Sequence, residues 1–346
     1  MAQTVAIEPT SPRPVQLLAQ RVVMVVYPDA NALDVSGPIQ VFATAAERAE
    51  ESGAPGGYEL IIASRTGGPV RLSCGMEIIT CPIEKLRIAG SDTVLVAGGN
   101  GSDAAAADDE LVRWVAQAAQ AAGRLGSICT GAFVLAAAGL LEGRRAVTHW
   151  AFCDQLRHVA PSALIEADAV FVEDRGLWTS AGVTAGLDMA LAMVELDLGA
   201  AVARETARRL VFFMRRPGRQ PQISAGLRAQ MADQSRVQAL AEWIAMHPRE
   251  NLTSRALAAR ARMSLRTLFR AFRDELEMAP TEFVRHARIE VACRLMDRCD
   301  LQLSEIADRA GFASPEAMRR AFVNAFRTTP ARYRAGIHPV AAGGRA

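Results

Sequence analysis

An alternation of short strand-like runs with helical patterns, between residues 20 and 200, constrains the fold of this chain most strongly. Such alternation is typical of a parallel sheet covered by helices on both faces. The expected strands are RVVMVVYPD (21–29), YELIIAS (58–64), DTVLVAGG (92–99), RLGSI (124–128), RAVTHW (145–150) and GLWTSAG (176–182). The expected helices cover residues 34–49, 108–123, 130–140, 151–159 and 184–198. AVFVEDRGLWTSAG (169–182) is expected to form a hairpin that turns at residues 174–176.

A break in periodicity divides the chain into two parts. Pro, Gly, Gln and Arg dominate FFMRRPGRQPQISAG (212–226), and only helical patterns follow it. The 346 residues are enough for about two domains of ~100–200 residues each. We therefore expect an α/β domain over residues 20–211, a linker over 212–232 and a helical domain over 233–336.

Composition argues against several classes of protein. The N-terminal residues MAQTVAIEPTSPRPVQLLAQ lack the basic and apolar regions of a signal peptide. No apolar run approaches the ~18 uncharged residues of a membrane span. The six cysteines (74, 81, 129, 153, 293 and 299) form no C-x-x-C pair, which argues against disulfides and metal sites. We expect a cytoplasmic protein without metal or cofactor, whose cysteines other than Cys129 are buried small hydrophobes.

The charges are distributed unevenly along the chain. Residues 1–232 hold 20 basic and 24 acidic side chains, whereas residues 233–346 hold 19 basic and 13 acidic ones. Nearly all the basic residues are arginine, and Lys85 is the only lysine. An acidic part joined to a basic part is typical of a nucleic-acid-binding module attached to another domain, although a solvated basic face gives the same balance.

Residues 257–283 and 306–333 are two copies of one pattern. Four residues recur 50 positions later: Arg270 as Arg320, Phe272 as Phe322, Pro280 as Pro330 and Phe283 as Tyr333. Each copy reads helix, turn, helix, the pattern of the DNA-binding helix-turn-helix. The segment between them, residues 280–297, predicts a helix of ~27 Å at 1.5 Å per residue. Two recognition helices held by it would lie close to one turn of DNA apart, ~34 Å.

Residues 235–335 resemble the DNA-binding domain of the AraC/XylS family. LSEIADRAGFASPEAMRRAFVNAFRTTPARYR (303–334) carries the I-A, G-F, R-x-F and P-x-x-Y-R pattern of that family. The resemblance implies two recognition helices that expose Arg266, Phe269 and Arg270 on the first, and Pro315, Glu316, Ala317, Arg319 and Arg320 on the second.

Arginine can bond guanine in the major groove or hold a phosphate, so these helices are the candidate DNA-binding surface. Alternatively, Arg270 and Arg320 form ion pairs within the motif. The recurring aromatic side chains are expected in the core: Phe272, Phe283, Phe312, Phe322 and Tyr333. Family members usually have glycine before each proline turn, where this chain has Glu277 and, in the second copy, Arg327 or Thr328. Those turns therefore lack the tolerance of glycine for positive φ.

RLGSICTGAF (124–133) predicts a strand, a sharp turn and a helix around Cys129, as in a nucleophile elbow. The positive end of the helix dipole is expected to lower the pKa of this thiol. Because the carboxyl ends of parallel strands form the ligand crevice of such folds, other residues that follow strands should meet Cys129 there. We expect one ligand pocket formed by Asp34, Gly98, Gly99, Cys129, Thr130 and His149.

The N–H groups of Gly98, Gly99 and Thr130 are candidates for an oxyanion pocket. Two of the pocket residues also have an ordinary structural interpretation. His149 is alternatively satisfied by backbone or solvent, and Asp34 is alternatively an acid that the dipole stabilises at a helix N-terminus.

Residues 20–200 resemble the ThiJ/PfpI superfamily, which has the flavodoxin-like fold of class I glutamine amidotransferases. The elbow cysteine, the Gly-Gly loop and the early acid carry this resemblance. Joined to an AraC-type domain, the chain resembles the GlxA-type transcriptional regulators. Peptidases of the superfamily usually have histidine directly after the elbow cysteine, where this chain has Thr130. Cys-Thr with an acid on the first helix also resembles the isonitrile hydratases of the superfamily.

The resemblance implies a ligand-responsive, sequence-specific DNA-binding regulator of metabolic genes, with activation favoured over repression. Its expected partners are promoter DNA, a small-molecule effector, a second copy of the chain and RNA polymerase, but no membrane. The effector is expected to be a nitrogen-containing metabolite, such as an amino acid or a quaternary amine. Three other roles of Cys129 stay open: the nucleophile of an enzyme of the isonitrile hydratase or amidase type, a redox sensor, or an inert core thiol.

Overall fold

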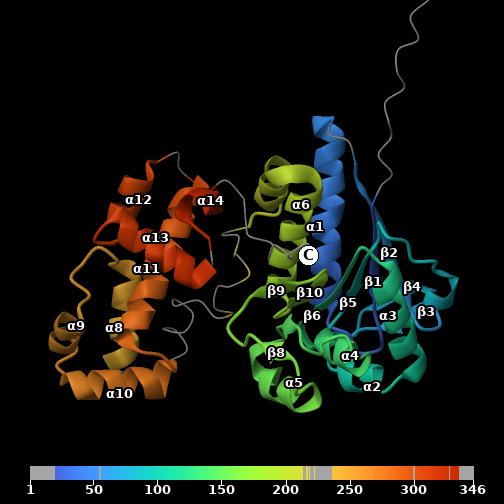
Figure 1. Ribbon diagram of the computed structural model, residues 1–346, viewed down its shortest axis with the longest axis horizontal. Helices are drawn as coiled ribbons and strands as arrows, with labels where there is room; N and C mark the ends of the chain where they lie inside the picture. Colours follow the sequence, from blue (N-terminus) through green and yellow to red (C-terminus); the bar gives the residue numbers. More distant parts are fainter. Residues whose placement is uncertain are drawn as a thin grey trace, which may run out of the picture.

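The computed structural model describes residues 20–53, 56–212, 216, 218, 222, 236–298, 301–326 and 328–334. Its N-terminal part contains an eight-stranded sheet of order β3-β4-β2-β1-β5-β6-β10-β9 (Figure 1). Neighbouring strands from β4 to β10 are parallel, and the edge strands β3 and β9 are antiparallel. The strands are β1 (Gln20–Val25), β2 (Tyr58–Ser64), β3 (Gly68–Arg71), β4 (Glu77–Pro82), β5 (Thr93–Val96), β6 (Arg124–Ile128), β9 (Phe171–Asp174) and β10 (Leu177–Ser180). The expected parallel α/β sheet is therefore confirmed.

Two layers of helices flank the sheet. The long helices α1 and α6 pack along each other, and α3 and α4 contact β6 (Figure 1). The central strand β5 is buried at every residue, as the run TVLV predicts for a strand covered on both faces. The helices are α1 (Ala32–Ser52), α2 (Ser102–Ala106), α3 (Asp109–Ala121), α4 (Ala132–Ala137), α5 (Cys153–Val159) and α6 (Thr184–Arg209). Helix α6 is interrupted at Gly199, whose φ of 85° and ψ of 164° are not helical, so its first section ends at residue 198 as expected and a second section continues to Arg209.

One expected strand is shorter than predicted and lies outside the main sheet. The expected strand at residues 145–150 is only β7 (Arg145–Ala146), which pairs with β8 (Leu164–Ile165) in a separate two-stranded sheet. Strand β10 occupies the place beside β6 instead. It has four consecutive buried residues and so fills a position that is covered on both faces, while residues 149 and 150 begin a short 3-10 turn.

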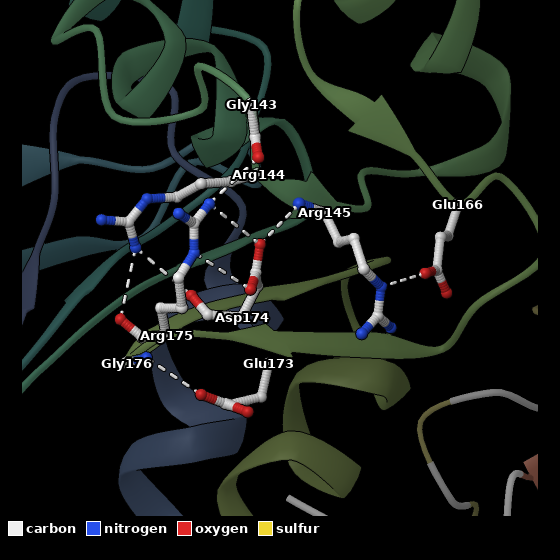
Figure 2. Close-up of polar contacts among 8 residues, drawn as sticks. All are labelled: Gly143, Arg144, Arg145, Glu166, Glu173, Asp174, Arg175 and Gly176. Atoms are coloured by element: carbon white, nitrogen blue, oxygen red, sulfur yellow. Dashed lines mark hydrogen bonds and ion pairs between the residues drawn. The ribbon is translucent and has the colours of Figure 1, made fainter. Parts of the chain in front are cut away.

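The hairpin of β9 and β10 turns at the expected residues, and Arg144 and Arg145 form hydrogen bonds with this turn. Arg175 and Gly176 both have positive φ, 55° and 81°, as a tight hairpin turn requires. Arg144 donates to the carbonyl oxygens of Asp174 and Arg175 at 3.2 and 3.3 Å, and the Arg145 N–H donates to the Asp174 carboxylate at 2.8 Å (Figure 2). These contacts join the turn to the short sheet of β7 and β8 and so stabilise the edge of the main sheet.

The C-terminal part contains helices only, as far as the structure describes it, and has two apolar cores, one for each repeat copy. Phe272 and Phe283 pack edge to face in the first core, and Phe322 packs against Tyr333 in the second. These four rings are buried and Phe312 is half-buried against the second core, which confirms the expected core role of the aromatic residues. The helices are α8 (Arg236–Met246), α9 (Ser254–Arg260), α10 (Leu265–Leu276), α11 (Pro280–Arg298), α12 (Leu303–Arg309), α13 (Pro315–Phe326) and α14 (Pro330–Arg334).

Helix α11 joins the two copies, as expected from the sequence. Its 19 residues span ~28 Å at 1.5 Å per residue. The Arg288 guanidinium of α11 donates to the backbone oxygens of Pro248 and Glu250, at 3.0 and 3.3 Å. Gly311 of the second copy approaches the same loop so closely that a Cβ would lie 1.8 Å from the Pro248 oxygen. The two copies are therefore fixed to each other and not merely tethered.

The cysteines differ in burial, and most of the expected linker lies outside the described residues. Cys153 and Cys293 are buried as expected and Cys81 is half-buried, but Cys74 is exposed in the turn before β4, so the expectation is wrong there. Cys299 lies outside the described residues, as does most of the expected linker, residues 212–232. No helix in the described ranges combines the length and the apolar character needed to cross a membrane.

Candidate functional site

Cys129 follows the last residue of β6 and lies in a strained turn. Its φ is +54°, a conformation that residues other than glycine seldom adopt. Residues Cys129–Gly131 form a short 3-10 turn that leads into α4, which confirms the expected strand–turn–helix. The Thr148 hydroxyl donates to the Cys129 carbonyl at 2.9 Å and fixes this turn from the loop after β7. A backbone held in a strained conformation by its surroundings is a mark of functional sites.

Asp34 lies in the first turn of α1 and reaches toward Cys129. The Asn31 side chain caps this helix by accepting from the N–H groups of Leu33 and Asp34. The Asp34 carboxylate is fully buried, and its Oδ1 accepts from the Val183 N–H at 2.7 Å. Its Oδ2 has no hydrogen-bond partner of regular geometry among the described residues, although the Cys129 thiol is near enough to affect its pKa. The thiol and the carboxyl therefore influence each other through proximity.

Two glycines make this close approach possible. A Cβ on Gly98 would lie 2.6 Å from the Cys129 Cβ and 2.7 Å from the Asp34 Oδ2. A Cβ on Gly182 would lie 2.4 Å from the Cys129 Cβ and 2.7 Å from its Sγ, and Gly182 also has φ +102°. The loop after β5 and the loop after β10 therefore enclose Cys129 from both sides.

The pKa values of Cys129 and Asp34 are both raised, whereas a thiolate at Cys129 would need a lowered thiol pKa. Burial, followed by the charge of Asp34, raises the pKa of the Cys129 thiol to about 12. Burial also raises the pKa of the Asp34 carboxyl to about 6, against the lowering effect of the Val183 N–H. The expected low thiol pKa at the helix N-terminus is therefore wrong, because desolvation and a neighbouring carboxylate outweigh the helix dipole. Burial and the neighbouring carboxylate therefore favour the protonated thiol of Cys129.

One of the N–H groups expected to form an oxyanion pocket, that of Gly99, is already hydrogen-bonded within the protein. The Gly99 N–H donates to the Thr130 hydroxyl at 2.9 Å, and this hydroxyl donates to the Gly99 carbonyl at 3.1 Å. The Gly98 N–H points toward the Asp34 carboxyl and contributes to its pKa. Because Gly99 is already bonded, its N–H is not free to hold an oxyanion. The structure thus brings Asp34, Gly98, Gly99, Cys129 and Thr130 together at one edge of the sheet, with Gly99 and Thr130 bonded to each other.

His149 directly follows Thr148, whose hydroxyl bonds the Cys129 carbonyl. Its Nδ1 accepts from the Ala151 N–H at 3.3 Å, and its ring lies against those of Trp150 and Phe152. Burial lowers the pKa of the imidazole. The Nδ1 atom is thus satisfied by the backbone, and a role of His149 in the ligand pocket stays a prediction.

Four residues outside the expected set, Gly182, Val183, Arg216 and Gln222, contact the site residues or the elements next to them. Val183, with the unusual φ of 45°, holds Asp34. Gln222 donates to the Thr148 carbonyl at 3.0 Å, and Arg216 donates to the buried Asp188 of α6 at 2.7 and 2.8 Å. Gly182 is the last residue of an expected strand and Val183 follows it directly, which is a signal the sequence offered. The contacts of Arg216 and Gln222 had no local signal, because those residues belong to an expected linker.

The expected DNA-binding residues lie on the outer faces of α10 and α13. Arg266, Phe269 and Arg270 are exposed on α10; Pro315, Glu316, Arg319 and Arg320 are exposed on α13, whereas Ala317 is half-buried. Ser264 and Ser314 cap the two helices in the same way, each accepting from the N–H three residues on.

Arg270 and Arg320 make no ion pair with any described residue, so the alternative of an internal ion pair does not hold for them. Arg319 is different, because its guanidinium donates to both carboxylate oxygens of Glu316, at 2.8 to 3.1 Å.

Glu277 confirms that the turn after α10 needs a positive φ. It ends α10 with φ +57° and ψ +18°, the left-handed conformation usual for a glycine cap. The equivalent turn of the second copy includes Arg327, which lies outside the described residues.

Comparison with known proteins places both parts of the chain in families. Residues 20–196 match the DJ-1/PfpI family, and residues 257–336 match a helix-turn-helix domain. The HTH-type transcriptional regulator CdhR of Pseudomonas aeruginosa is 31% identical over 280 residues, which cover 80% of this chain and 82% of that protein. The HTH-type transcriptional regulator GlxA of Rhizobium meliloti is 30% identical over 279 residues, 80% of this chain and 85% of that protein.

An enzyme is also similar to the N-terminal part. The isonitrile hydratase of Pseudomonas putida is 31% identical over 188 residues, which cover 54% of this chain and 76% of that protein. The match with the two regulators extends through both parts of the chain. The chain therefore belongs to the DJ-1/PfpI family, in the group whose members join this domain to an AraC-type helix-turn-helix domain and are named HTH-type transcriptional regulators.

Proposed function

We propose that this protein is a ligand-responsive transcriptional regulator that binds promoter DNA through both helix-turn-helix motifs and activates metabolic genes. The observation that carries the proposal is the pair of capped recognition helices on one shared helix, with exposed arginines that have no ion-pair partner in the described residues. Guanidinium groups in such positions bond guanine or phosphate in the major groove. The resemblance to CdhR and GlxA supports the same conclusion.

The α/β domain is the proposed sensor, and its effector is a small nitrogen-containing metabolite. Asp34 Oδ2 is buried with no regular hydrogen bond from the described residues. A buried carboxylate oxygen without a well-formed hydrogen bond is costly, and an ammonium or N–H group of a ligand would satisfy it better than the nearby Gly98 N–H and Cys129 thiol do. An amino acid in the pocket of Asp34, Gly98, Gly99, Cys129, Thr130 and His149 would donate to this oxygen, whereas a quaternary amine, which has no N–H group, would act through its charge alone. Either ligand would favour the ionised form of Asp34.

Contacts with the linker supply the proposed route from this pocket to the DNA-binding domain. Thr148 bonds the Cys129 carbonyl through its hydroxyl, and its own carbonyl accepts from Gln222. Arg216 bonds Asp188 and Thr184 of α6, the helix that begins just after Val183. A ligand that moves Cys129 or Val183 would change both contacts. Such a ligand shifts the regulator between states only to the extent that it binds them with different affinity.

Selection of genomic DNA fragments by the purified full-length protein, followed by footprinting, tests the regulator directly. We expect a discrete protected site upstream of a metabolic operon, bound by a dimer, and recruitment of RNA polymerase when the effector is present. Arg320→Ala should weaken binding to that site by about 1–3 kcal/mol if Arg320 bonds a base. Binding without any preferred site would contradict the proposal.

The role of the pocket has its own test. Cys129→Ala should leave DNA binding intact but change the response to the effector in a reporter strain. Gln222→Ala should keep both binding activities and weaken their coupling. A normal response in both variants would remove the pocket from the proposal.

One observation favours a second function, cysteine-dependent hydration or amide hydrolysis. Cys129 combines a strained backbone with an adjacent carboxyl, and the isonitrile hydratase shares 31% identity with this domain. Incubation of the full chain with isonitriles and amides decides the matter, because turnover that disappears in Cys129→Ala would assign an enzyme. The redox-sensor alternative is less favoured, because it needs an accessible thiol of low pKa, whereas Cys129 is buried and its pKa is raised. Mild peroxide that changes DNA binding in the wild type and not in Cys129→Ala would support it.

A further inference from the structure

The two recognition helices occupy equivalent positions but expose different side chains. Buried Leu268, Phe272 and Leu276 of α10 correspond, 50 residues on, to buried Met318, Phe322 and Phe326 of α13. With the register fixed by these inner residues, the outer positions can be compared one by one. Leu265, Arg266, Phe269, Arg270 and Arg273 of α10 face outward where α13 has Pro315, Glu316, Arg319, Arg320 and Val323.

The outer face of α10 is cationic with two apolar side chains. Arg266, Arg270 and Arg273 are exposed and have no ion-pair partner in the part of the chain that the structure describes. Leu265 and Phe269 are 43% and 41% exposed, although side chains of this kind are normally buried. Apolar side chains on a recognition helix contact thymine methyl groups, and free arginines contact phosphate or guanine.

The outer face of α13 has a carboxylate where α10 has an arginine. Glu316 stands at the position of Arg266, in the first turn of the helix, which is the part that contacts base edges. It binds Arg319 through three contacts of 2.8 to 3.1 Å, and this pairing lowers the pKa of the Glu316 carboxyl. Glu316 is therefore ionised at neutral pH, and of the charged residues described on this face only Arg320 is outside an ion pair.

We propose that the two motifs divide the recognition of DNA, with α10 supplying most of the affinity and the Glu316–Arg319 pair of α13 supplying selectivity for cytosine. This division rests on the proposed DNA-binding function. A carboxylate in the groove is repelled by phosphates on every sequence, and an amino group of a base must offset this cost. Acidic side chains accept from cytosine N4, whereas the adenine N6 amino group stands beside the N7 acceptor, which repels a carboxylate. Glu316 thus weakens binding wherever no cytosine faces it. Arg319, held by Glu316, contributes less phosphate binding than a free arginine.

Glu316→Gln in the full chain tests this division, because it removes the charge and keeps the size. We expect non-specific DNA to be bound about three to ten times more tightly at low salt, with the salt slope steeper by about 0.9. We also expect the preference for cytosine at one operator position to fall by at least about fivefold. Arg266→Gln, at the equivalent position of α10, should weaken the binding of non-specific DNA and make its salt slope shallower by about 0.9.

A matched control is available in the same motif. Glu305 pairs with Arg309 at 2.7 Å on α12, outside the recognition helix, and has similar exposure. Glu305→Gln should leave affinity, salt slope and base preference unchanged. Arg319→Gln should weaken non-specific binding, since it leaves the Glu316 charge uncompensated.

The outcomes separate this inference from the proposed function. A wild-type protein that selects no site from random DNA would overturn both. A selected site with unchanged cytosine preference in Glu316→Gln, or with weaker non-specific binding in that variant, would overturn only the division between the motifs. Equal effects of Glu316→Gln and Glu305→Gln would show a general charge effect and would overturn it as well.

Discussion

The substitution Asp34→Asn isolates the electrostatic cost of the buried carboxyl. Asparagine keeps an oxygen that can accept from the Val183 N–H, at 2.7 Å in the wild type, and removes the charge beside Cys129. The variant should therefore fold in the same way, and its stability should respond differently to pH.

The sign and size of the effect follow from the pKa of Asp34. Burial raises it from 3.8 to about 6, so between these values the folded state binds a proton that the unfolded state has lost. The contribution of Asp34 to stability is then most favourable below about pH 4, decreases as the pH rises and stays constant above about pH 6. A pKa difference of about two corresponds to about 3 kcal/mol. The Asp34→Asn variant has no such dependence, so its stability relative to wild type should increase by about 3 kcal/mol between about pH 4 and about pH 7.5.

Urea unfolding at several pH values measures this difference. Trp243 belongs to the helical domain, so a Trp243→Phe background leaves the fluorescence to the three tryptophans of the α/β domain, of which Trp178 is buried in β10. The unfolding free energy of Asp34→Asn minus that of the wild type should increase between about pH 4 and about pH 6. Above about pH 6 this difference should stay constant. A constant difference over this range would refute the raised pKa and with it the desolvation argument.

The rate of alkylation of the Cys129 thiol is an independent measure of the Asp34 charge. Burial and then Asp34 raise the pKa of Cys129, so Asp34→Asn should lower it and speed alkylation of Cys129 in mildly alkaline buffer. Exposed Cys74 serves as the internal reference in the same digest. Equal Cys129 rates in the wild type and the variant would show that burial alone protects the thiol.

Two further predictions concern the backbone at special positions. Gly182→Ala should destabilise the α/β domain by more than about 2 kcal/mol in urea unfolding, since its Cβ would overlap Cys129 and its φ is positive; Gly143→Ala, also at positive φ but in open space, should cost only about 1 kcal/mol. Glu277→Gly should stabilise the helical domain by up to about 1 kcal/mol, because glycine adopts the left-handed cap of α10 without strain, and an unchanged midpoint would contradict this.

Much of the fold could be predicted because it depends on local patterns. The buried runs of β1, β5 and β6, the elbow at Cys129 and the 50-residue repeat are all properties of short segments. The departure at Glu277 was also informative, since the structure places positive φ at that residue. The placement of residues 145–150 was wrong because sheet neighbours are decided by packing between distant segments, and β10 competes for the same place.

The candidate site shows where local reasoning stops. Sequence position brought Asp34, Gly98 and Cys129 to one edge of the sheet, as the topology of parallel strands requires. The thiol pKa was misjudged because the helix dipole can be anticipated from a motif, whereas desolvation and the approach of Asp34 can be known only from coordinates.

The sequence by itself therefore determined the two folds, the repeat and the residues that gather at the strand ends, because each depends on periodicity or on chain order. The tertiary structure alone decided the contact between Asp34 and Val183, 149 residues apart, the contacts of Gln222 and Arg216 with the α/β domain, and the raised pKa of Cys129. Burial and charge at a point depend on every segment packed around it, and no local pattern carries that information.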